Sequence, residues 1–125
     1  MRILKSSEDY LETMLVMSER HGYIRSIDIA AELGVTKPSV SYAVKRLREN
    51  GYITMNRDGL ITLTEKGLEI ANRIYERHKV LTQMLVFWGV DPKTAREDAC
   101  KMEHDISDET FEAMKRHQAQ SLEKT

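Results

Sequence analysis

The 125-residue sequence contains only one cysteine, two prolines and six glycines. Cys100 has no partner for an internal disulfide, which excludes a small disulfide-stabilised secreted domain. The scarcity of proline and glycine argues against a disordered chain and favours a soluble, mainly helical protein. The sequence also lacks an apolar run near the ~18–20 residues that span a bilayer, and residues 1–5 lack a signal-peptide core. We therefore expect a cytoplasmic protein with no membrane partner.

The chain also lacks the basic excess typical of nucleic-acid binders, because its formal net charge is −1. The charges are unevenly distributed, however. Residues 36–60 carry five basic and two acidic side chains, whereas residues 86–125 carry six basic and nine acidic ones. The first segment suits contact with phosphate, and the second is acidic enough to attract cations.

Apolar periodicity and capping residues predict the order of helices and strands. Ser6 or Ser7 is expected to cap a first helix that ends near His21. Two further helices are predicted at 26–33 and from 37 or 38 to 49, followed by a β-hairpin of 52–55 and 60–63 with an Asp-Gly turn. Three helices complete the pattern: one from Thr64 to Trp88, one capped by Asp91 whose apolar stripe runs from Ala95 to Ile106, and one capped by Ser107.

A helix-turn-helix is predicted where Ala30 is followed by Gly34 and then by Val40. Two helices that meet at a tight turn need a small side chain at the crossing, a glycine at the bend and an aliphatic residue on the second helix. The hairpin that follows is then expected to be the wing of a winged helix. The residues that we expect to contact DNA are Arg25, Ser26, Thr36, Lys37, Pro38, Ser39, Ser41, Tyr42, Lys45, Arg46 and Arg57.

Potential metal ligands gather in the second half of the chain. Cys100, Glu103 and His104 have the spacing of one helix face and offer sulfur, oxygen and nitrogen together. His78 on the long helix is a further candidate, as are Asp9 and Glu12, which lie off the apolar stripe of the first helix. Each of these residues alone also has an ordinary explanation, as a helix-end carboxylate or a solvated surface side chain. The spacing by itself is therefore only suggestive of a metal site.

With both halves considered, the sequence resembles the diphtheria toxin repressor and manganese transport regulator family of metal-dependent transcriptional repressors. The resemblance covers nearly the whole chain. Its motifs are Asp9-Tyr-Leu-Glu12, the helix-turn-helix, Arg77-His78, Gly89-Val-Asp91 and the most specific one, Ala99-Cys-x-x-Glu-His104 with Ser107-Asp108.

The resemblance implies a mainly α fold, with a winged helix-turn-helix DNA-binding domain at residues 1–64 and a helical dimerisation and metal-sensing domain at 65–125. It implies Asp9, Cys100, Glu103 and His104 as primary ligands, and Glu12 with His78 as ligands of an adjoining site that Glu103 can bridge. Asp9 and Glu12 match the manganese-sensing branch, whereas Cys100 matches the iron-sensing branch. Thr82 and Arg96 stand where the iron branch has ancillary ligands, so we expect no ancillary site.

Together with the resemblance, these features predict a non-enzymatic homodimeric repressor that binds a palindromic double-stranded DNA operator, with Mn²⁺ or Fe²⁺ as cofactor. The resemblance also implies metal-uptake genes as targets. Co²⁺, Ni²⁺ or Zn²⁺ could substitute, since a thiolate suits softer ions, and no small organic substrate is expected. The apolar residues Leu81, Met84, Leu85, Phe87 and Trp88 either form the dimer surface or fill the core. Two alternatives stay open: a winged-helix regulator that senses an oxidant or organic ligand through Cys100, and, more distantly, a small zinc metallohydrolase.

Overall fold

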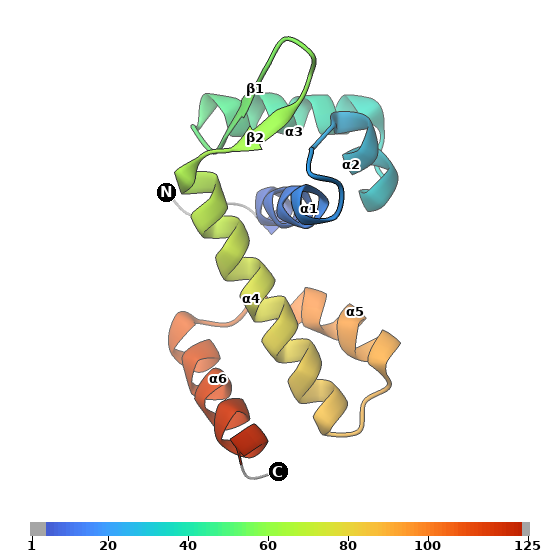
Figure 1. The fold of residues 1–125 in the computed structure, drawn as a ribbon. Helices are drawn as coiled ribbons and strands as arrows, with labels where there is room; N and C mark the ends of the chain where they lie inside the picture. The colour runs from blue at the N-terminus through green and yellow to red at the C-terminus, as the bar shows by residue number, and fades with distance from the viewer. Residues whose placement is uncertain (1–4, 124–125) are drawn as a thin grey trace. The chain divides into compact units, whose positions relative to one another are not determined.

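The computed structural model describes residues 5–123, which form six helices and one two-stranded antiparallel sheet (Figure 1). The chain divides after Arg73 into two compact units, and the division falls inside the longest helix, α4. The predicted mainly helical fold with a two-stranded wing is confirmed. The elements are α1 (Lys5–His21), α2 (Ser26–Leu33), α3 (Lys37–Glu49), β1 (Ile53–Met55), β2 (Ile61–Leu63), α4 (Glu65–Phe87), α5 (Pro92–Met102) and α6 (Asp108–Glu123).

The first unit is a three-helix core with a hairpin packed beside α3 (Figure 1). The helix-turn-helix has the predicted construction. Gly34 ends α2 in the left-handed conformation at φ 66°, and its N–H donates to the Ala30 carbonyl. Val40 on α3 is 1% exposed, and α3 packs against both α1 and α2. Ser6 and Ser7 lie inside α1, so the predicted serine cap was wrong; serine is only mildly unfavourable within a helix, and the buried apolar face of α1 outweighs this cost.

The hairpin is held by its own turn and by the segment before α2. The strands pair Ile53 with Leu63 and Met55 with Ile61. Asn56 accepts hydrogen bonds through Oδ1 from the N–H groups of Asp58 and Leu60, at 2.9 and 3.0 Å, while Gly59 has φ 79°. An asparagine that bonds the backbone two residues on is an Asx turn, so Asn56 fixes the turn together with the predicted Asp-Gly pair.

The start of α4 is fastened to the hairpin by Thr64. Its hydroxyl donates to the carbonyl of Gly51 at 2.7 Å and accepts from the N–H of Gly67 at 3.2 Å, as an N-cap does. Gly67 touches the backbone of Tyr52 so closely that a Cβ atom at this position would lie 2.0 Å from the Tyr52 carbonyl oxygen. Glycine is therefore required by contact here, since the residue has no unusual φ.

The second unit consists of the C-terminal part of α4, α5 and α6. Leu81, Met84 and Ala99 are buried together, and Met102, Ile106 and Met114 pack against them. Leu81 and Met84 therefore belong to the core of the unit. Phe87 and Trp88, at the end of α4, are 62% and 60% exposed and leave an apolar surface.

Both predicted caps are present in this unit, because Asp91 accepts hydrogen bonds from the N–H groups of Lys93 and Thr94, and Ser107 accepts one from Thr110. The α5 helix ends at Met102, earlier than the apolar stripe to Ile106 predicted. The turn that replaces the last predicted helical turn is stabilised by a long-range contact, in which a guanidinium from α4 donates to the carbonyls of Glu103 and Ile106.

Candidate functional site

Three potential metal donors meet inside the second unit. His78 projects from α4, Cys100 from α5 and Glu103 from the turn that follows α5. The Nδ1 atom of His78 lies 3.0 Å from Oε2 of Glu103 and 3.8 Å from Sγ of Cys100. All three ligand atoms lie within 4.8 Å of one another, which is close enough for one ion to reach all of them. We refer to these three residues as the donor triad.

Burial increases steadily across the donor triad. Cys100 is exposed, the side chain of His78 is 22% exposed, and that of Glu103 is fully buried. Contacts with Cys100 and with the Glu103 carboxylate raise the pKa of His78 from 6.5 to about 10, and partial burial offsets a smaller part of the rise. In the metal-free protein we therefore expect His78 to be a cation that pairs with the buried carboxylate.

The Glu103 carboxylate has the character of a ligand. Its Oε1 atom is buried and, among the described residues, has no hydrogen-bond partner, although Nε2 of His104 lies 3.5 Å away. A buried carboxylate oxygen without a hydrogen bond is costly and calls for an explanation. Nitrogen, sulfur and carboxylate oxygen are also the donors that divalent transition metals use. Both observations fit a bound divalent cation, and the buried His104 supplies a further nitrogen beside the same carboxylate.

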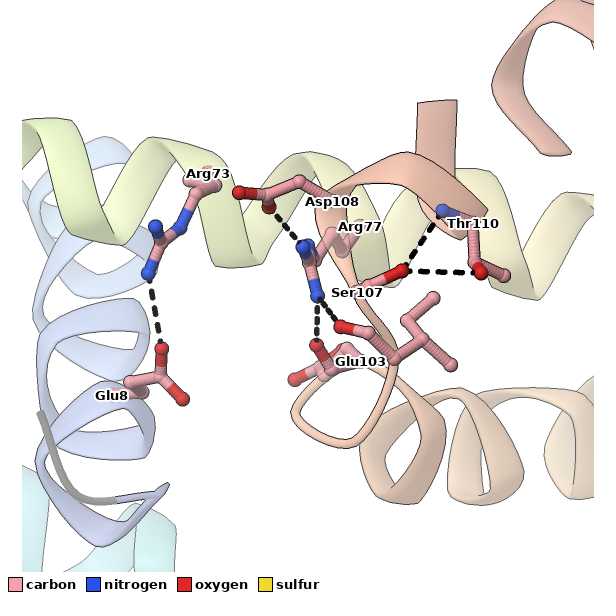
Figure 2. A network of polar contacts seen from close by, with 8 residues as sticks. Glu8, Arg73, Arg77, Glu103, Ser107, Asp108 and Thr110 are labelled. Carbon is pink, nitrogen blue, oxygen red and sulfur yellow. Dashed lines mark hydrogen bonds and ion pairs between the residues drawn. The ribbon is translucent and has the colours of Figure 1, made fainter. Parts of the chain in front are cut away.

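The turn that carries Glu103 and His104 is held by Arg77 (Figure 2). Nη1 of Arg77 donates to the carbonyls of Glu103 and Ile106, both at 2.9 Å, and Nη2 forms an ion pair with Asp108. The guanidinium also lies 5.2 Å from the ring of Phe111. The sequence places Arg77 beside His78 and Lys79 as if on a solvated face, but Arg77 is 5% exposed. No local sequence pattern predicts this role, because the partners of Arg77 lie 26 to 34 residues away in the sequence.

The two carboxylates predicted on the first helix lie in the other unit. Asp9 and Glu12 are both half-buried on α1. The residue before them, Glu8, is buried and accepts a hydrogen bond from Arg73 of α4 at 3.3 Å (Figure 2). Sequence periodicity did not single out Glu8, because a carboxylate in the first turn of a helix is ordinarily a partner of the helix dipole.

The predicted DNA-contacting residues lie in the first unit, at its surface. Ser26 is half-buried, and the other ten are exposed. Thr36 caps α3: it accepts a hydrogen bond from the N–H of Ser39, and their hydroxyls lie 2.8 Å apart. One turn further on, Tyr42 accepts a hydrogen bond from Arg46 at 3.3 Å. The leading end of α3 thus presents hydroxyl and basic groups, the side-chain types that read base edges and phosphates.

Arg57 at the tip of the hairpin and Arg25 at the start of α2 add positive charge to the same unit. Both are exposed, and the Arg25 guanidinium lies 5.0 Å from the ring of Tyr23. Lys45 is exposed further along α3.

Within residues 5–123, none of the helices combines the length and the apolar character required to cross a bilayer.

Comparison with known proteins finds two family descriptions that together cover almost the whole chain. Residues 2–61 match "Iron dependent repressor, N-terminal DNA binding domain" and residues 64–120 match "Iron dependent repressor, metal binding and dimerisation domain". A helix-turn-helix transcriptional regulator of Methanocaldococcus jannaschii is 42% identical over 113 residues, which cover 89% of this chain and 90% of that protein. The transcriptional regulator MntR of Escherichia coli O157:H7 is 38% identical over 86% of this chain and 70% of its own length.

Among solved structures, a manganese-dependent transcriptional repressor in complex with manganese is 25% identical to this chain with a TM-score of 0.81. The match covers 89% of this chain and 51% of the repressor. The chain therefore spans about half the length of that structure, whereas it spans most of the Methanocaldococcus relative.

Proposed function

Because this chain belongs to the iron-dependent repressors, which are DNA-binding transcriptional regulators and not enzymes, we propose that it represses manganese or iron uptake genes. The family dimerises and binds divalent metal through its second domain, and in this proposal the ion switches on binding to a palindromic operator. Residues 1–64 form the DNA-binding domain in this proposal, and residues 65–125 the dimerisation and metal-sensing domain. Its place of action is the cytoplasm.

We further propose that the donor triad and His104 hold the ion together with Asp9 and Glu12. The observation that carries this proposal is the convergence of His78, Cys100 and the buried, incompletely bonded carboxylate of Glu103. When bound, the ion supplies positive charge and shared coordination to these side chains. The structurally similar repressor is manganese-dependent, and carboxylates suit Mn²⁺. The thiol of Cys100 favours Fe²⁺ and allows Co²⁺, Ni²⁺ or Zn²⁺.

The DNA-binding face of this proposal is the leading end of α3 with the hairpin and the start of α2. Thr36, Ser39 and Tyr42 are exposed where a recognition helix meets base edges. A dimer with two such helices matches a palindromic site, because half-sites repeat at a whole number of DNA turns. We assign the dimer surface to the exposed apolar residues at the end of α4, Val86, Phe87 and Trp88.

The test is operator binding as a function of added ion. A palindromic duplex is first selected from random sequences with the metal-loaded protein, and its affinity is then measured with Mn²⁺, Fe²⁺, Co²⁺ or Zn²⁺ and with a chelator. Wild type is compared with Cys100→Ala and Glu103→Ala, and with Lys79→Gln as the matched control on the surface of α4. We expect the ion to raise the affinity of wild type and of the control roughly 5–150-fold, the range of typical allosteric couplings.

Both donor variants should lose most of this response while they still bind DNA weakly. Equal operator affinity for all four proteins, with and without ions, would contradict the metal switch. A response to peroxide in place of metal would instead favour redox sensing through Cys100. Replacement of Ser39 by Ala should weaken sequence preference and leave ion uptake intact, which separates the two functions of the chain.

A further inference from the structure

The end of α5 and the turn after it depend on a single side chain from α4. Helix C-termini leave carbonyls without helical partners, and here Nη1 of Arg77 takes two of the carbonyls in this segment, those of Glu103 and Ile106. Nη2 pairs with Asp108 at the start of α6 (Figure 2). One planar group thus ties the end of α5, the turn and the beginning of α6 to α4.

Glu103 is held at its side chain as well as at its backbone. Arg77 bonds the main-chain carbonyl of Glu103, while the next residue of α4, His78, contacts the carboxylate of Glu103. Two successive residues of one helix therefore fix both the backbone and the side-chain direction of the buried donor. Contacts of this kind orient a metal ligand before the ion binds.

Burial of a guanidinium is an expensive way to hold a turn. The Arg77 side chain is 6% exposed, and its charge is compensated by Asp108 and by the Phe111 ring. Apolar side chains of similar size often give equal or greater stability in such positions. Stability alone therefore does not account for an arginine here, whereas the need for several directed donors at fixed positions does, because only arginine carries them in one rigid fork.

We propose that Arg77 is a positioning residue for the metal centre, which sets the place of Glu103 and His104 relative to His78. This inference rests on the proposed function, since it concerns the same ion. The sign of the effect separates positioning from simple electrostatics. Loss of a positive charge near a cation site raises metal affinity on Coulombic grounds, whereas loss of positioning lowers it.

The experiment measures Co²⁺ and Mn²⁺ affinity by competition with a chelator, together with the thiolate-to-Co²⁺ charge-transfer absorption that reports Cys100 coordination. For Arg77→Met we expect a 10–100-fold loss of affinity, the usual effect of removing a group that orients a ligand, and a weaker absorption per bound Co²⁺. Arg77→Lys keeps the positive charge but lacks the planar guanidinium, so it should recover only part of the metal affinity that Arg77→Met loses. The control Lys79→Gln removes a charge from the same turn of α4 and should retain wild-type affinity or bind slightly more tightly.

A second pair of variants covers the case in which Arg77→Met fails to fold. Asp108→Asn weakens the ion pair with Arg77 at an exposed side chain, and Asp105→Asn removes the same charge from the turn before α6 without touching Arg77. We expect the first to reduce affinity more than the second. Equal effects of this pair, or wild-type affinity and absorption in a folded Arg77→Met protein, would overturn the inference and leave the metal switch standing. A wild type that binds no Co²⁺ would overturn both.

Discussion

His78 should carry a proton in the metal-free protein at neutral pH. Its pKa is raised to about 10, mainly by the hydrogen bond with Cys100 and next by the hydrogen bond with Glu103. At pH 7.5 such a group is more than about 99% protonated, whereas a histidine with a pKa of 6.5 is about 9% protonated. A histidine must be neutral to coordinate a metal, so coordination by His78 at this pH releases close to one proton and costs about 3 kcal/mol, or roughly 300-fold in affinity.

The assay is an NMR titration of the His78 imidazole in metal-free protein, with Cys100→Ala as the matched variant. We expect a midpoint near 10 in wild type and a clearly lower one in the variant, because its main partner is gone. Calorimetry of Mn²⁺ binding in buffers of different ionisation enthalpy should then show about one more proton released at pH 7.5 by wild type than by His78→Ala. A wild-type midpoint at or below 7 would refute the reasoning.

The same shift determines how the stability of the metal-free protein depends on pH. A pKa that is higher in the folded state means that the folded state binds the proton more tightly. The contribution of His78 to stability is therefore fully present below pH 6.5 and is lost as the pH rises toward 10. Urea unfolding of the metal-free protein between pH 6.5 and 10 should show this decline, and Cys100→Ala should show less of it.

Three further predictions concern the first unit. Gly67→Ala should destabilise the protein by about 1–3 kcal/mol in urea unfolding, because the new Cβ meets the carbonyl of Tyr52. The control Asn72→Ala on the exposed surface of α4 should stabilise the protein by a few tenths of a kcal/mol. A stabilising Gly67→Ala substitution would contradict the contact with Tyr52. Lys45→Gln should reduce the slope of log affinity against log salt for DNA by about 0.9 if this side chain neutralises a phosphate, whereas an unchanged slope would remove Lys45 from the interface. Asn56→Ala should destabilise the hairpin and weaken operator binding without changing Mn²⁺ affinity, and normal DNA binding by this variant would exclude the hairpin from the contact.

The helix-turn-helix was predictable because its determinants are local. The two adjacent helices and the turn between them contain Ala30, Gly34 and Val40, so the spacing of these residues alone predicts how the two helices pack. The caps at Asp91 and Ser107 are local in the same sense. For the donor triad, the residue types were evident from the sequence, whereas the grouping of His78 with Cys100 required the structure.

The features that the sequence concealed depend on contacts across the fold. The apolar stripe of α5 continues to Ile106, yet the helix ends at Met102, and the turn that follows is stabilised by hydrogen bonds from Arg77 to the carbonyls of Glu103 and Ile106. Arg77 itself looks like a surface residue between other polar side chains. Phe87 and Leu81 share the apolar character of α4, but only the packing of α5 and α6 decides that Leu81 is buried and Phe87 is not. Periodicity specifies a face, and it does not specify what will cover that face.

The exposure gradient across the donor triad has a kinetic consequence. If the donor triad holds the ion as proposed, an ion from solvent would meet the exposed sulfur of Cys100 before the imidazole of His78 and the buried carboxylate of Glu103. Loss of the ligands in the reverse order would leave the thiol bound last, at the side that a competing chelator would reach. Alkylating reagents reach the same exposed thiol, so the rate at which Cys100 is alkylated would report the residence time of a bound ion.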